Sequence, residues 1–102
     1  MFDLLPLVRI LHSNGSRILL LDSTACVAAW LRKHAFQSES AGEALSTFLS
    51  WCLMRTVELA HEWGFAVVAV ECDADTWRSL RDTRGLAGQI YPGIEIRSSH
   101  AV

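Results

Sequence analysis

The chain has 102 residues, which is enough for one domain with a modest hydrophobic core. Hydrophobic residues make up 51% of it, which excludes an intrinsically disordered protein. The formal net charge of −2 excludes a general attraction for polyanions, so any nucleic-acid binding must come from a local patch. No apolar run is long enough to cross a membrane, and the three cysteines lie in apolar segments, as reduced core residues do. We therefore expect a single cytoplasmic domain over residues 1–102.

The first part of the chain predicts a helix, a turn and a strand. Residues 1–12 are mostly apolar and favour a short helix that starts near Pro6. Residues 13–16, Ser-Asn-Gly-Ser, are a turn signal. Residues 18–21 form a continuous apolar run that ends at Asp22, which is typical of a strand buried on both faces of a parallel sheet.

Two helices are predicted after this strand. Either Ser23 or Thr24 can cap the first helix, whose apolar residues recur at helical spacing as far as His34. Residues 40–43 have the spacing of a capping box, and residues 45–63 repeat apolar side chains every three or four positions. Gly64 then supplies a helix stop.

A second buried strand is predicted over residues 65–70, followed by three acids, Glu71, Asp73 and Asp75. Because helices separate the two strands, we expect the strands to be parallel, with both acidic ends at the same edge of the sheet.

The last part of the chain predicts one more helix and one more strand. Residues 77–84 favour a short helix that ends at Gly85, and residues 89–97, with a turn at 91–93, can begin a third strand. Residues 98–102 are expected to form a loose tail. The whole pattern predicts a small three-layer α/β domain with a parallel sheet of about three strands and flanking helices.

The acids at the strand ends are candidate ligands for Mg²⁺ or Mn²⁺. Asp22 and Asp73 are the natural pair, with Asp75 or Glu71 as a third ligand. Magnesium prefers oxygen ligands and is often held by one or two carboxylates together with substrate phosphates. Acids in these positions are also common as helix caps. Two interpretations therefore remain open: these acids bind a metal ion, or they cap helices.

Three arginines follow the acids at three-residue spacing: Arg78, Arg81 and Arg84. On one side of a short helix they could contact a phosphodiester backbone. The alternative is a solvated face whose arginines pair with Asp75 and Asp82.

Two segments resemble the 5′–3′ exonuclease and flap endonuclease family. Residues 18–30, Ile-Leu-Leu-Leu-Asp-Ser-Thr-Ala-Cys-Val-Ala-Ala-Trp, resemble its opening motif, in which an apolar strand ends in a metal-binding Asp. Residues 44–53 are similar to its next helix, and residues 67–78, Val-Val-Ala-Val-Glu-Cys-Asp-Ala-Asp-Thr-Trp-Arg, to its second motif. The spacing from Asp73 to Trp77-Arg78 is most like that of phage members. The resemblance extends roughly over residues 17–90 and implies a PIN-like, resolvase-like (Rossmann-like) core.

By that resemblance, Asp22 and Asp73 would be metal ligands and Arg78 a catalytic contact near the scissile phosphate of DNA. The family's Tyr-Lys-x-x-Arg-like segment falls on residues 86–90, where both cations are missing unless Arg81 or Arg84 substitutes. The family's further acid clusters lie downstream of the matched residues. The nuclease site would then be incomplete in this chain: the chain would be either a truncated nuclease or one completed by another chain that supplies the missing acids.

Three functions are consistent with these residues. The first is a 5′ nuclease domain of DNA replication and repair that depends on Mg²⁺ or Mn²⁺. The second is a non-catalytic relative that binds nucleic acid or protein. The third is an unrelated doubly wound regulatory domain in which Asp22 is a helix cap.

Overall fold

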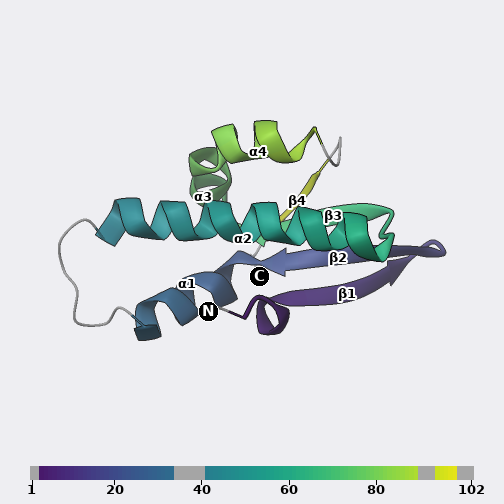
Figure 1. The fold of residues 1–102 in the computed structure, drawn as a ribbon, viewed down its shortest axis with the longest axis horizontal. Coiled ribbons are helices and arrows are strands. Elements are labelled where there is room, and N and C mark those ends of the chain that lie inside the picture. Colours follow the sequence, from purple (N-terminus) through teal and green to yellow (C-terminus); the bar gives the residue numbers. More distant parts are fainter. Residues whose placement is uncertain (1–2, 34–40, 90–93, 99–102) are drawn as a thin grey trace.

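The structure is a computed structural model that describes residues 3–33, 41–89 and 94–98. Its centre is a four-stranded sheet in the order β1-β2-β3-β4, with helices packed along it (Figure 1). β1 is antiparallel to β2, whereas β2, β3 and β4 are parallel to one another. The elements in chain order are η1 (Leu5–Leu7, a 3-10 helix), β1 (Val8–Ser13), β2 (Ser16–Asp22), α1 (Ser23–Lys33), α2 (Ala41–Trp63), β3 (Val67–Cys72), α3 (Ala74–Ser79), α4 (Arg81–Ala87) and β4 (Glu95–Ser98).

The prediction of a short helix that starts near Pro6 is wrong beyond the first turn. Among the described residues 3–13, only Leu5–Leu7 is helical, with Pro6 in its first turn, and Val8–Ser13 pairs as a strand with β2. Asn14 and Gly15 join the two strands with φ angles of 51° and 78°. An Asn-Gly pair with positive φ at both positions makes the two-residue turn whose twist suits a hairpin. The predicted turn is therefore confirmed, and it closes a hairpin rather than ending a helix.

α2 supplies the helical side of the core. Its residues Leu49, Leu53, Val57 and Ala60 recur at three- and four-residue steps and are almost fully buried. The helix lies over β2 and β3 (Figure 1). Gly64 follows with φ of 73°, the left-handed conformation that commonly ends helices, as predicted. The predicted capping box at 40–43 lies outside the residues whose side chains the structure describes.

The strands β2 and β3 are buried on both faces. Leu19, Leu21, Val68 and Val70 point to the main core, which they share with α1, α2 and α4. The alternate residues form a smaller cluster on the opposite face of the sheet: Ile18, Leu20 and Ala69, with Leu11 and Val67 packed against them. This two-sided burial explains why both strands read as continuous apolar runs.

The predicted α/β class, with a largely parallel sheet and flanking helices, is confirmed. The single helix predicted over 77–84 is wrong: the segment forms α3 and α4, which meet at Leu80, and α4 continues past Gly85 to Ala87.

The third strand is present as β4, which is shorter than predicted. The predicted turn at 91–93 lies outside the described residues. Of the predicted tail, Ser98 belongs to β4 and residues 99–102 lie outside the described part. Within the described ranges, no helix is both long and apolar enough to span a bilayer.

Candidate functional site

The two acid-bearing strand ends lie side by side. Asp22 is the last residue of β2, and its register partner on the parallel strand β3 is Glu71. Asp73 follows two residues later, directly after β3 ends. The carboxyl edge of a parallel sheet is where α/β proteins commonly bind ligands. The register therefore places the predicted pair, Asp22 and Asp73, at one edge of the sheet.

Each of these aspartates caps the helix that follows it. Oδ1 of Asp22 accepts a hydrogen bond from the Ala25 N–H at 3.1 Å, and Oδ1 of Asp73 accepts one from the Thr76 N–H at 2.7 Å. These bonds satisfy backbone donors in the first turns of α1 and α3. The prediction that Ser23 or Thr24 caps α1 is wrong, since Asp22 does so.

Ser23 has a different structural role. Its side chain is almost fully buried, and its hydroxyl donates a 2.7 Å hydrogen bond to the carbonyl oxygen of Glu71. This bond ties the start of α1 to the end of β3. It therefore fixes the position of one strand end relative to the other.

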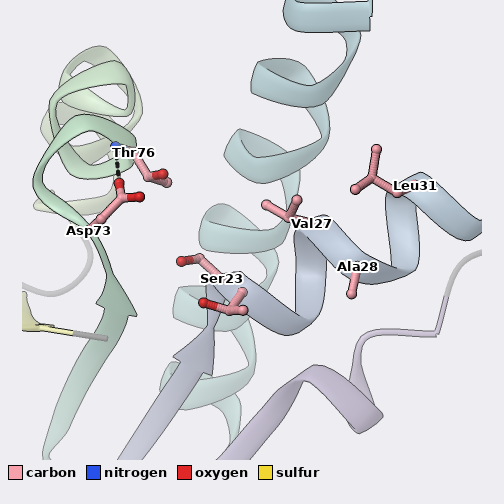
Figure 2. Close-up of a pocket in the computed structure, with 7 residues that line it drawn as sticks. Ser23, Val27, Ala28, Leu31, Asp73 and Thr76 are labelled. Atoms are coloured by element: carbon pink, nitrogen blue, oxygen red, sulfur yellow. Dashed lines mark hydrogen bonds between the residues drawn. The ribbon is translucent and has the colours of Figure 1, made fainter. Parts of the chain in front are cut away.

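A pocket of about 330 Å³ lies at this edge, between α1 and α3. In Figure 2, Val27, Ala28 and Leu31 project from α1 on one side, and Asp73 and Thr76 lie on the other. The apolar residues give the pocket a wall against which a flat or aliphatic group can pack. Its polar groups gather at the helix starts and are supplied by Ser23, Thr24, Asp73 and Thr76.

The three predicted phosphate-binding arginines do not share one helix. Arg78 belongs to α3 and forms a 2.9 Å ion pair with Asp75, on side chains that are 74% and 90% exposed. Arg81 is exposed at the first position of α4. Arg84 is half-buried, with its guanidinium 4.5 Å from the centre of the Trp77 ring. Arg78 and Arg81 are thus accessible to a ligand, whereas Arg84 packs against the protein.

Glu71 is engaged by an arginine that the sequence did not single out. Arg9 of β1 crosses β2 to pair with it at 3.1 Å. Asp75, the other candidate third ligand, pairs with Arg78. The Arg78–Asp75 pair is solvent-exposed and therefore weak, whereas Glu71 in the other pair is only 29% exposed.

Cys72, the cysteine next to Asp73, has a thiol of low reactivity. Burial raises the pKa of the Cys72 thiol, and the charge of Asp73 acts in the same direction, against smaller opposing effects of Ser23 and Arg84. The pKa of the Cys26 thiol is also raised, chiefly by a hydrogen bond shared with Cys52 and by burial. Thiols with raised pKa values are poor nucleophiles and poor metal ligands at neutral pH.

The donor set suits a metal ion only in part. Two carboxylates match the small protein contribution typical of magnesium sites that also use substrate phosphates. The cap hydrogen bond uses one of the two carboxylate oxygens of each aspartate, so the other oxygen can still bind a metal ion. In the described ranges, however, no three side chains among His, Cys, Asp and Glu are grouped to hold an ion. A metal ion would therefore need further ligands besides Asp22 and Asp73.

Several residues at this edge were not anticipated from the sequence. The sequence predicts that Ser23 is a cap and that Arg9 lies in a helix, and it predicts no role for Thr76. Only the sheet register and the chain's path bring these side chains to the strand ends. The apolar spacing of α1 could have indicated that Val27 and Leu31 share a helix face, but not that this face lines a pocket.

Comparison with known proteins gives no match: no family model, no curated protein and no solved structure is similar to this chain.

Proposed function

We propose that this chain is a 5′–3′ exonuclease-like domain that acts on DNA through Mg²⁺ or Mn²⁺ bound at Asp22 and Asp73, in the cytoplasm. The observation that carries the proposal is the parallel register of β2 and β3, which brings the acidic ends of both family-like motifs to one edge of the sheet. This is the arrangement that the resemblance to 5′ nucleases requires of those two residues.

The roles of the side chains follow from their chemistry. Asp22 and Asp73 bind the ion, which would neutralise phosphate charge and activate water. Arg78 is exposed and can leave its weak pair with Asp75 to contact a phosphate near the ion. Another chain supplies the remaining acidic ligands, because the described residues contain no group of three acids, histidines or cysteines arranged to hold an ion.

The test is a cleavage assay on 5′-flap and single-stranded DNA with Mg²⁺ or Mn²⁺, using Asp22→Asn and Asp73→Asn. Asparagine caps helices as well as aspartate does, so both variants keep the fold while losing ligand charge. Loss of a metal ligand should lower the rate by at least about 100-fold. The matched control is Asp82→Asn, an exposed acid in the first turn of α4.

The proposal requires metal-dependent cleavage that both site variants lose and that Asp82→Asn retains. Since the missing ligands come from another chain, the assay is run with the purified domain and again in an extract of its source cells. Cleavage that is equal in all variants, or absent in both settings, contradicts the proposal.

The second candidate is a DNA-binding relative without catalysis. The observation that favours it is that both aspartates already serve as helix caps. Under this alternative, Asp22→Asn and Asp73→Asn leave DNA binding intact, whereas Arg78→Gln weakens it. Loss of one phosphate contact should lower the slope of log affinity against log salt by about 1. Titrations of labelled DNA at several salt concentrations measure that slope.

A further inference from the structure

The exposed large apolar side chains are not spread evenly over the surface of the molecule. Three of the seven that the described residues contain, Leu5, Trp51 and Trp63, line one groove of about 320 Å³ between η1 and α2. We call it the η1–α2 groove. Leu4 and Leu59 also line it but are themselves buried. Large apolar side chains that gather on a concave surface mark an interaction site.

The wall that α2 contributes to the groove is a straight stripe of side chains. Trp51, Arg55, Leu59 and Trp63 follow at four-residue steps, which places them one above another on the helix. At about 1.5 Å per residue, the stripe is about 18 Å long. It is therefore long enough for about three turns of a second helix to lie along it.

Both tryptophan rings are held in place by neighbours. Trp51 stacks on Phe48 with ring centres 6.4 Å apart, and the Trp63 ring lies 6.2 Å from that of Phe65. Arg17 packs over Phe65 and donates a 3.2 Å hydrogen bond to the Trp63 carbonyl oxygen. Rings that are already ordered lose little entropy on binding, and tryptophan is among the residues that most often dominate protein–protein affinity.

The charges in and beside the groove favour a cationic partner. Asp3 lies on one wall, and Arg55 on the other is paired with Glu58 at 3.1 Å and with Glu62 at 3.7 Å. Three carboxylates therefore accompany one guanidinium. The pairs with Arg55 are exposed and weak, so both glutamates can also contact another cation. A second copy of the chain would bring the same excess of acid, and a nucleic acid would bring a larger one.

The tryptophans favour the same partner. A lysine or arginine side chain binds over an aromatic face, and tryptophan is the best ring for this contact. The chain already uses such contacts, with Arg84 lying 4.5 Å from the centre of the Trp77 ring and Arg17 4.8 Å from that of Phe65. The long stems of lysine and arginine also pack along apolar surface while their charged ends reach acids.

We propose that the η1–α2 groove binds a basic amphipathic helix of a partner protein. The apolar side chains of that helix pack between Leu5 and the two tryptophans of α2. Its lysines and arginines reach Asp3 on one side of the groove and Glu58 and Glu62 on the other. This interface does not depend on the proposed nuclease function, because none of its residues lies at the acidic edge of the sheet.

Two synthetic peptides test the charge of the partner. Each has about 14 residues, carries leucine at helical spacing and is held helical by a hydrocarbon staple; the remaining positions are all lysine in one and all glutamate in the other. In NMR spectra, the lysine peptide should shift the indole N–H signals of Trp51 and Trp63 and leave that of the buried Trp30 unchanged. No shift with the lysine peptide would overturn the proposal. Equal shifts with the glutamate peptide or with single-stranded DNA would also overturn it.

Two matched substitutions test the position of the interface. Leu5→Gln and Leu86→Gln replace leucines that are 56% and 57% exposed, and Leu5 lines the groove whereas Leu86 does not. Leu5→Gln should weaken binding of the lysine peptide at least about tenfold, and Leu86→Gln should leave it unchanged. Circular dichroism checks that both variants are folded. Equal effects of the two substitutions would contradict the proposed site.

Charge substitutions should change the affinity for the lysine peptide in opposite directions. Asp3→Asn keeps an acceptor for the Leu5 N–H and should weaken binding by about two- to fivefold, whereas the exposed Asp82→Asn in α4 should have no effect. Arg55→Met keeps an apolar stem and should tighten binding, because it leaves the two glutamates without their cation. Weaker binding by Arg55→Met, or equal effects of Asp3→Asn and Asp82→Asn, would overturn the proposal.

Discussion

Asp22 and Asp73 each give one oxygen atom to the first turn of the following helix. Capping and metal binding depend on different properties of the same side chain. A cap needs one acceptor oxygen, which asparagine also supplies, whereas a metal ligand needs the negative charge. Substitutions at these positions can therefore separate the two roles.

Asp22→Ala should destabilise the domain by about 1 kcal/mol, because the Ala25 N–H loses its acceptor. Asp22→Asn should change the free energy of unfolding by only a few tenths of a kcal/mol. Urea unfolding followed by circular dichroism measures both. If Asn destabilised the fold as much as Ala, the carboxylate charge rather than the cap would be the stabilising feature.

The buried thiols make stability depend on pH on the alkaline side. The pKa of Cys26 is raised in the folded state, so the unfolded chain loses this proton first, near the ordinary value of 9.0. The stabilising effect of the protonated thiol is complete below that pH and decreases as the pH rises above it. As the pH is raised from about 8 to about 10, the unfolding midpoint of the chain should fall. The midpoint of Cys26→Ala should fall less steeply over the same range. Identical slopes in the two proteins would contradict this assignment.

Some of the helices and strands can be predicted from sequence patterns, and others cannot. α2 was predictable because its apolar positions repeat over many turns and Gly64 ends it. The sequence does not predict β1, because a short apolar run fits a helix as well as a strand; the signal that favours a strand hairpin is Asn14-Gly15. The break at Leu80 was missed because no Gly or Pro marks it.

Two glycines should respond in opposite ways to alanine. Gly64→Ala should destabilise the domain by about 1 kcal/mol, because its φ of 73° is unfavourable for a residue with a side chain. Gly85→Ala should stabilise it by up to about 1 kcal/mol, because Gly85 lies inside α4 with open space around its Cβ position. Thermal unfolding measures both changes. A stabilising Gly64→Ala would show that α2 does not end in the left-handed conformation.

The candidate site exists only in the assembled molecule. Asp22 and Asp73 lie at the same edge of the sheet because β2 and β3 pair in parallel register, with α1 and α2 between them in the chain. That juxtaposition was predictable, since acids that follow two buried parallel strands must share an edge. The cap hydrogen bonds, the Ser23 anchor and the Arg9–Glu71 pair depend on side-chain positions that spacing does not determine.

The proposed function depends on Asp22 and Asp73 binding one divalent ion at this edge. The most direct test is a titration with Mn²⁺ followed by NMR, because the ion broadens the signals of nearby nuclei. If both aspartates bind the ion, we expect broadening centred on the amides of Ala25 and Thr76, which donate to the two carboxylates. This effect should be lost in Asp73→Asn and kept in Asp82→Asn. Signals that stay sharp at both amides, or broadening that survives in Asp73→Asn, would contradict it.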